Sequence, residues 1–181
     1  MSLFHKLLTR LHTRLLSSMR QRVVIGNGSR VDYRVEIGWR CALTMGERSI
    51  LYKNVTIYAE QGGAVTIGSR SHIAPYGYLL VGAQKLVIGD DVAIGPFCAL
   101  FCVTNAPSDV PKMRHRESYR YDDIRIGNNV FIGAHSVVLP GTVVEDNVVI
   151  AANSTLSGLL ESGWLYGGNP ARPIRELPIH G

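Results

Sequence analysis

The chain has 181 residues, 46% of them hydrophobic and 18% charged, and carries a formal net charge of +5. This length and composition suit one globular domain with an elongated core and exclude a disordered chain. Three cysteines, Cys41, Cys98 and Cys102, have neither disulfide-framework density nor a metal-ligand spacing. They favour a reducing compartment, and the basic segments lack the aromatic residues of a nucleic-acid surface.

Residues 1–22 form an N-terminal segment in which residues 2–20 predict an amphipathic helix. Its apolar positions are Leu3, Phe4, Leu7, Leu8, Leu11, Leu15 and Met19. Two uses stay open for this helix. It would cap the first coil of the domain or pack on a neighbouring subunit, or its apolar face would rest on the inner membrane surface. The segment resembles neither a secretory signal nor a transmembrane stretch, so we expect a cytoplasmic protein, with or without peripheral membrane contact.

Residues 23–165 contain a six-residue repeat. An aliphatic residue recurs at every sixth position in Ile126, Ile132, Val138, Val144, Ile150 and Leu156, and earlier in Ile25, Val31, Ile37, Leu43, Ile67, Ile73, Ile88, Ile94 and Leu100. A period of six fits neither a helix nor an ordinary strand, so the chain must turn a corner once per repeat. Ser71, Ser136 and Ser154 stand two places before an aliphatic residue, and we expect both positions to point inward. The repeat predicts a three-sided β-solenoid.

Three stretches interrupt the repeat. The phase breaks over residues 44–53, which we interpret as irregular, and slips between Ile73 and Ile88, where we expect a bulge. The main interruption is a loop at residues 103–124, which holds prolines, charges and tyrosines. A long insertion on a regular scaffold is usually functional. Residues 166–181 form a C-terminal tail that we expect to fold back from Pro173.

The hexads, the interruption between Leu100 and Ile126, and the ending Gly-Gly-Asn-Pro-Ala-Arg-Pro-Ile-Arg at 167–175 resemble the hexapeptide-repeat acyltransferases. The resemblance covers roughly residues 23–177 and is closest to the branch of sugar O-acetyltransferases. It implies an all-β, left-handed parallel β-helix that assembles as a homotrimer. It also implies acetyl-CoA as donor, a sugar or glycan acceptor, no metal, and O-acetyl transfer in surface polysaccharide or glycolipid biosynthesis.

The reaction needs a general base, and the family's usual histidine at the start of the long loop is missing here. Asn105 or Ala106 stands at that position, and neither accepts a proton at neutral pH. A second family residue, an asparagine one coil earlier, falls near Pro75 and is also absent. His115 in the loop and His135 on the following coil are the two candidate catalytic residues. Each would otherwise be a surface histidine.

The resemblance also implies residues that contact the two substrates. Small residues on successive coils, Gly133, Ala134, Ala151 and Ala152, would line the pantetheine arm of coenzyme A, although every corner of a solenoid needs small residues. Arg172 or Arg175 would meet its phosphates, a task that suits a guanidinium group. In the loop, the candidates for contact with the acceptor are Asn105, Asp109 and Tyr119.

A second class of function remains open, because the missing histidine favours a non-catalytic hexapeptide-repeat protein that retains the scaffold and a ligand site. A zinc enzyme of the same fold is excluded, since His72, His115 and His135 lack the spacing of three zinc ligands.

Overall fold

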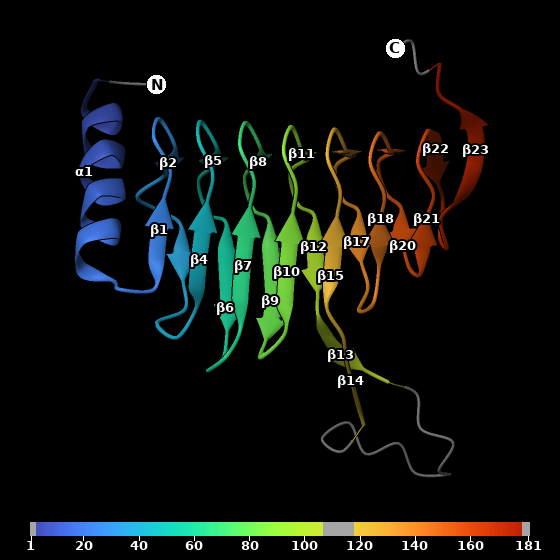
Figure 1. Cartoon of the computed structure of the whole chain (residues 1–181), viewed down its shortest axis with the longest axis horizontal. Coiled ribbons are helices and arrows are strands. Elements are labelled where there is room, and N and C mark those ends of the chain that lie inside the picture. Colours follow the sequence, from blue (N-terminus) through green and yellow to red (C-terminus); the bar gives the residue numbers. More distant parts are fainter. Residues whose placement is uncertain (1–2, 107–117, 179–181) are drawn as a thin grey trace.

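A computed structural model describes residues 3–106 and 118–178. The chain forms a three-sided rod of stacked parallel strands, with helix α1 (Leu3–Met19) at one end (Figure 1). The repeat therefore predicted the solenoid correctly. Residues 107–117 of the inserted loop lie outside the described residues.

Each face of the rod is one sheet, and every coil contributes one strand to each sheet in turn. The first sheet contains β1 (Val23–Ile25), β4 (Ala42–Met45), β7 (Ala64–Ile67), β10 (Lys85–Ile88), β15 (Ile124–Ile126), β18 (Val143–Val144) and β21 (Leu159–Leu160). The second sheet contains β2 (Arg30–Val31), β5 (Ile50–Leu51), β8 (His72–Ile73), β11 (Ala93–Ile94), β16 (Phe131–Ile132), β19 (Val149–Ile150), β22 (Trp164–Gly167) and β23 (Arg172–Glu176). The third sheet contains β3 (Glu36–Ile37), β6 (Thr56–Ala59), β9 (Tyr78–Gly82), β12 (Ala99–Phe101), β17 (Val137–Val138) and β20 (Thr155–Leu156).

The aliphatic residues of the repeat stack into one core along the axis of the rod. Ile73, Ile94 and Ile132 occupy one register on the second sheet, and all three are fully buried. Burying an aliphatic side chain of this size contributes about 2 kcal/mol. Each coil adds one such side chain to the column on each of the three sheets, so the core grows with every coil.

Inward serines connect successive coils through their hydroxyl groups. Ser49 donates to the carbonyl of Gly68 at 2.6 Å, and its oxygen accepts the backbone N–H of Ser71 at 3.1 Å. On the later coils Ser136 and Ser154 are also buried. The predicted inward position of these residues is confirmed, because their hydroxyls satisfy backbone groups at corners where the strand hydrogen bonds stop.

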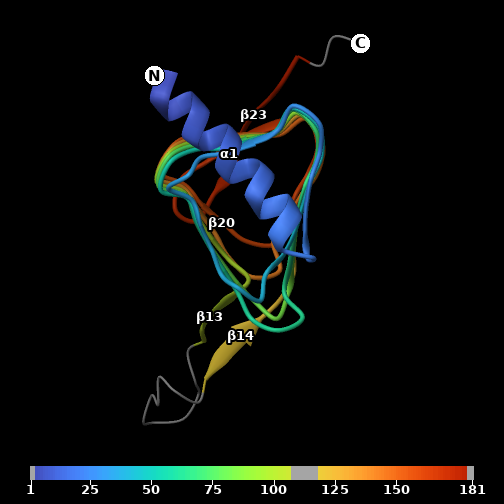
Figure 2. The ribbon, with the colours of Figure 1, turned by 90° about the vertical axis from the view of Figure 1, so that its left-hand side faces the viewer.

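Three corners separate the sheets, and we number them by the sheet that precedes each. The turns of the second corner all have the same length, at residues 32–35, 52–55, 74–77, 95–98, 133–136 and 151–154. The turns of the third corner vary, at residues 38–41, 60–63, 83–84, 102–123, 139–142 and 157–158. The inserted loop leaves the rod at this third corner (Figure 2).

Residues 44–53, which we interpreted as irregular, are a regular part of the second coil. That interpretation is wrong, because Met45 takes the register of Ile67 while Leu43 pairs two residues earlier with Val65. Strand β4 places two residues inward instead of one, so the six-residue count shifts without any loss of structure. The expected bulge between Ile73 and Ile88 is present, as a register shift where β6 pairs with β9.

Helix α1 lies across the open end of the first coil (Figure 2). Its docking face combines Leu16, which packs against the core, with polar groups. The Thr13 hydroxyl accepts the backbone N–H of Val31 at 3.0 Å, and His5 Nε2 lies 2.7 Å from an Asp32 carboxylate oxygen. The helix therefore caps the solenoid, but not through its apolar stripe: Phe4, Leu7, Leu11, Leu15 and Met19 are all exposed. The edge strand presents unpaired backbone groups, so hydroxyl and imidazole groups contact it beside Leu16.

The other end of the rod is closed by the chain itself. Strand β23 runs antiparallel to β22, the last strand of the second sheet (Figure 1). Parallel pairing continues as far as Leu165 and Tyr166, which lie beside Val149 and Ile150 of β19. The chain reverses between β22 and β23 through a cis peptide bond at Asn169–Pro170.

Candidate active site

The second corner carries His135, the candidate base that lies within the described residues. The His135 ring stacks on Phe97, with centroids 5.0 Å apart and planes 9° from parallel. Phe97 stacks in turn on Tyr76 at 4.9 Å and 3°. Stacked aromatic pairs contribute about 0.5–1.5 kcal/mol beyond simple burial. The exposed imidazole is therefore held at the end of a column of three rings, which we call the aromatic column.

The backbone explains why these rings align. Tyr76, Phe97 and His135 occupy the same place in successive turns and all have positive φ, at 65°, 58° and 59°. The N–H of His135 donates to the carbonyl of Pro96 at 3.0 Å, and that of Phe97 donates to the carbonyl of Pro75 at 3.1 Å. Because these bonds repeat from coil to coil, the backbone conformation at each turn is fixed by its neighbour. The side chains consequently project in register.

The four small residues of the predicted donor site flank His135 on the same corner. Ala134 is half-buried and Ala152, one coil later, is exposed. Gly133 is buried beside Ala152, and a Cβ added to Gly133 would collide with the Ala152 backbone. Gly133 is thus needed for the close packing of successive coils. Ala151, on the next coil, is half-buried. Because Ala134 and Ala152 have only methyl side chains, a long ligand can approach the backbone at these two positions.

The inserted loop begins and ends as a hairpin at the third corner. Strand β13 (Val103–Asn105) pairs antiparallel with β14 (Tyr119–Tyr121), and Asn105 lies opposite Tyr119. Both residues are exposed. Two further predicted site residues, Asp109 and His115, lie outside the described residues.

The C-terminal arginines lie on β23, the outermost strand of the second sheet. Arg172 pairs with Gly167 and Arg175 with Leu165 of β22. Both side chains are exposed, and each guanidinium donates a hydrogen bond to the backbone carbonyl of an adjacent residue, Arg172 to Ala171 at 3.1 Å and Arg175 to Glu176 at 3.2 Å. They remain available to an anion approaching the C-terminal end of the rod.

The structure brings some of these residues together and separates others. His135, Ala134 and Ala152 share the second corner, whereas Asn105 and Tyr119 project from the third. The width of the third sheet lies between the two groups. Within one chain, the hairpin residues and the small-residue corner are therefore on opposite edges of one face.

Other reactive side chains are less suited to catalysis. His72 lies on the second sheet, and its ring packs edge-on to Tyr52. Burial lowers the pKa of His72. Burial raises the pKa of Cys41 to about 11 and that of Cys102 to about 12, and it also raises the pKa of Cys98. Since the thiolate is the nucleophile, these buried thiols are inert near neutral pH. Among the described residues, no group of His, Cys, Asp and Glu is placed to hold a metal ion.

Sequence reasoning missed the aromatic column. Tyr76 and Phe97 are one coil apart, but the inserted loop separates Phe97 from His135 by 38 residues. Only the coil register, in which Leu100 pairs with Val138 on the adjoining strands, shows that Phe97 and His135 are neighbours. The signal in the sequence was the shared position of all three, directly before the inward residue of each second-corner turn.

These features define a class, the parallel β-helix proteins with an inserted loop and small-residue corners. The family described as "Bacterial transferase hexapeptide (six repeats)" matches residues 123–158. Galactoside O-acetyltransferase of Escherichia coli (strain K12) is 33% identical over 149 residues, which cover 82% of this chain and 71% of that enzyme. The chain belongs to the hexapeptide-repeat acyltransferase family, and this relative is an acetyltransferase.

Two further comparisons agree with this membership. The putative lipopolysaccharide biosynthesis O-acetyl transferase WbbJ of Escherichia coli (strain K12) is 35% identical over 72 residues, 40% of this chain and 35% of that protein. Among solved structures, the N-acyltransferase AntD of Bacillus cereus in complex with dTDP and 3-hydroxybutyryl-CoA superposes with a TM-score of 0.76. It is 22% identical and covers 91% of this chain and 88% of its own. The left-handed β-helix that the resemblance implied is confirmed at the level of the fold.

Proposed function

We propose that this protein transfers an acetyl group from acetyl-CoA to a hydroxyl group of a sugar during the synthesis of a surface polysaccharide or glycolipid. The names of its relatives support the acceptor class, since one acts on galactosides and another belongs to lipopolysaccharide biosynthesis. The observation that carries the proposal is the exposed His135 imidazole. It is held by the aromatic column on the corner that also carries Ala134 and Ala152.

His135 is the proposed general base. Its imidazole accepts the proton of the acceptor hydroxyl while the oxygen attacks the thioester carbonyl. A carbon–oxygen bond forms, the carbon–sulfur bond breaks, and the proton then passes from the imidazole to the departing thiolate. Stacking on Phe97 supports this role, because a base must keep one orientation throughout the transfer.

The donor is proposed to lie along the second corner over Ala134 and Ala152. Small side chains there allow the pantetheine arm to approach the backbone, while Gly133 and Ala151 keep the coils closely stacked beneath it. Arg172 and Arg175, exposed on β23, would receive the phosphates as charge-assisted hydrogen-bond donors.

The assembled form is proposed to be a homotrimer. The donor corner and the hairpin residues Asn105 and Tyr119 lie on opposite edges of the third sheet, so one chain does not bring them together. A neighbouring prism could place its loop over the donor corner, and three such contacts close a ring. Each active site would then combine residues of two subunits.

The assay follows thiol release from acetyl-CoA with a panel of sugar acceptors. We expect His135→Ala to lower kcat by about 10²- to 10⁴-fold, the usual contribution of a general base. His72→Ala serves as the matched control, because His72 lies on β8, two coils before His135, and its ring packs against Tyr52 and not against the aromatic column. A loss of turnover in His115→Ala alone would assign the base to the loop, and full activity in both variants would reject both histidines.

A non-catalytic protein remains the second candidate, favoured by Asn105 and Ala106 at the usual position of the base. Binding of coenzyme A with no acceptor-dependent thiol release would support it. An acceptor that raises thiol release above background in the wild type, and not in His135→Ala, would exclude it.

We also propose a cytoplasmic location at the inner membrane surface. The stripe of Phe4, Leu7, Leu11, Leu15 and Met19 on α1 is 44–73% exposed. Lys6, Arg10 and Arg14 flank it, and α1 contains no acidic residue. A helix of this kind binds anionic bilayers in the plane of the interface. Within residues 3–106 and 118–178, no helix is long and apolar enough to span the bilayer.

Vesicle cosedimentation tests the membrane contact. Leu11→Asp should weaken binding to anionic vesicles by about tenfold or more, since it places a charge in the apolar face that inserts into the bilayer. Ser17→Asp changes the net charge of α1 equally at another exposed position and should weaken binding less. Equal losses in both variants would show that only charge matters and would reject insertion of the apolar stripe.

A further inference from the structure

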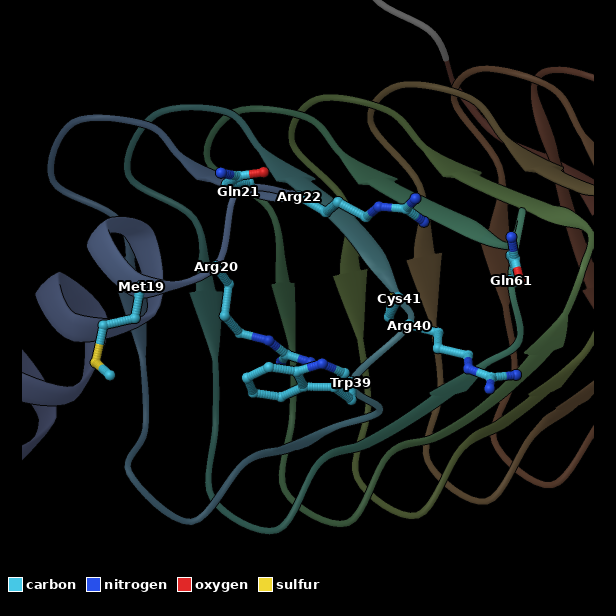
Figure 3. A pocket seen from close by; sticks show the side chains of 8 residues that line it. All are labelled: Met19, Arg20, Gln21, Arg22, Trp39, Arg40, Cys41 and Gln61. Atoms are coloured by element: carbon cyan, nitrogen blue, oxygen red, sulfur yellow. The ribbon is translucent and has the colours of Figure 1, made fainter.

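A pocket of about 350 Å³ lies where the C-terminal end of α1 meets the third corner of the first coils (Figure 3). Its lining includes Met19, Arg20, Arg22, Trp39, Arg40 and Gln61, and we call it the Trp39 pocket. Its volume is within the range of small-molecule sites. It is on a different corner from His135, and the proposed acetyl transfer makes no use of it.

Arg20 fixes the aromatic wall of this pocket. Its guanidinium donates to the carbonyls of Ile37 at 3.2 Å and Gly38 at 2.8 Å. The same group lies 4.9 Å from the centre of the Trp39 ring. Arg20 therefore holds one side of the indole by a cation–π contact, while the Trp39 side chain remains 83% exposed. A large aromatic ring kept in place at this exposure offers a preformed stacking surface.

Arg22 and Arg40 supply positive charge beside this ring. Both side chains are exposed, and neither makes a hydrogen bond or ion pair with the part of the chain that the structure describes. In Figure 3 both guanidinium groups extend past Cys41 toward the side of the pocket where Gln61 lies. None of the described residues that line the pocket is acidic. Two unpaired guanidinium forks on one side of a fixed indole form an anion site with a flat wall.

We propose that the Trp39 pocket binds a nucleoside diphosphate, with the base stacked on Trp39 and the diphosphate between Arg22 and Arg40. Bases stack on aromatic side chains without any need for sequence-specific contacts, and guanidinium forks match phosphate oxygens. A diphosphate carried on a lipid shares the anionic group but has no base, so its binding would depend on the arginines and not on Trp39. The proposal holds whether or not the protein transfers acetyl groups.

The test titrates the full-length protein with uridine diphosphate and thymidine diphosphate by calorimetry, without acetyl-CoA. We expect saturable binding that Trp39→Ala weakens by about tenfold, the value of one stacked base. Arg22→Gln and Arg40→Gln should each weaken it by at least about tenfold and reduce its dependence on salt. Arg125→Gln is the matched control, because Arg125 is an exposed arginine of the first sheet outside the pocket.

Three results would overturn the proposal. The first is the absence of saturable binding by either nucleotide. The second is equal binding of inorganic pyrophosphate and nucleoside diphosphate with no effect of Trp39→Ala, which would remove the base from the site. The third is retention on phosphatidic acid vesicles, lost in Arg22→Gln, without nucleotide binding, which would assign the pocket to a lipid phosphate. Unchanged thermal unfolding of the variants, expected for exposed side chains, shows that each result concerns binding.

Discussion

The second and third corners of the rod differ in what they allow the sequence to do. Every turn of the second corner, from 32–35 to 151–154, has the same length, while the turns of the third range from the pair 83–84 to the insertion 102–123. Constant length puts side chains into register from coil to coil, as in the aromatic column. Where turn length varies, side chains of successive coils do not align, and the turns can form other structures, such as the β13–β14 hairpin and the Trp39 pocket. The regular second corner can hold a side chain such as His135 in one orientation. The variable third corner can differ in the ligand that it binds.

The comparison has a steric basis. At the second corner the coils approach so closely that a Cβ on Gly95 would lie 2.7 Å from the backbone nitrogen of Ala134. At the third corner a Cβ on Gly158 would have no atom within 4 Å, although its φ of +73° disfavours most side chains. Substitution at Gly95 is therefore limited by packing against the next coil, and substitution at Gly158 by local backbone conformation alone.

The largest effect should come from filling the tight corner. Gly95→Val places a branched side chain against backbone atoms that cannot rotate away, so the two coils must separate. We expect the free energy of unfolding to fall by about 3 kcal/mol. Denaturant unfolding followed by circular dichroism measures this loss.

Gly158→Asn is the control at the third corner. Asparagine tolerates a positive φ and meets no neighbour there, so the loss should stay below about 1 kcal/mol. Equal losses in the two variants would contradict a difference in packing between the Gly95 and Gly158 sites.

The repeat made most of the rod predictable. Ile126, Ile132 and Val138 show the phase without interruption, and each is buried as expected. A residue that recurs every six positions has one orientation in every coil, so inward positions can be counted. The count fails where one strand has two inward residues, as at Leu43 and Met45 of β4. The repeat gives the spacing of aliphatic residues along the chain and not the direction in which each side chain points.

The features that were not predictable depend on contacts between distant coils. The apolar stripe of α1 left two uses of the helix open, and it did not reveal that Thr13 and His5 would dock the helix beside Leu16. The end of a solenoid exposes hydrogen-bonding groups, which a hydrophobic pattern does not reveal. The Trp39 pocket likewise joins Arg22, Trp39 and Gln61 from three segments with no common spacing. The candidate base His135 was identifiable, but its stacking partner was not.

An intermediate effect should follow from breaking the aromatic column. Phe97→Ala removes the ring that holds the His135 imidazole, so the base samples more orientations. We expect kcat to fall by about tenfold, equivalent to the loss of one stacked pair. KM should change little, because Phe97 is assigned a positioning role and no contact with substrate.

Two variants accompany this measurement. Phe97→Tyr keeps the stacked ring and should restore kcat, whereas Tyr76→Ala removes a ring one coil further away and should have a smaller effect. If Phe97→Ala kept full kcat while His135→Ala lost it, the column would be a packing feature without influence on the base.

The smallest effect concerns the first turn of the same corner, where Asp32 joins the rod to α1. The Asp32 carboxylate lies 2.7 Å from His5 Nε2 and accepts hydrogen bonds from Arg34 Nε and the Arg34 backbone N–H, each at 3.0 Å. Burial raises the pKa of Asp32, but the hydrogen bonds from Arg34 and His5 outweigh burial and hold it below 3.8. A carboxyl with a lowered pKa stabilises the fold near neutral pH, and this contribution is lost as the pH falls through the lowered value.

Asp32→Asn should therefore reduce the free energy of unfolding by about 1 kcal/mol near neutral pH. The difference from wild type should shrink as the pH drops below 3.8, where protonation removes the same charge from the native protein. Thermal unfolding at a series of pH values from about 7 to about 3 measures this difference. Asp91→Asn breaks an exposed pair with Arg70 at the first corner and should cost less, because solvent screens that pair. A difference between wild type and Asp32→Asn that stays constant with pH would mean that the carboxylate charge does not hold α1 to the rod.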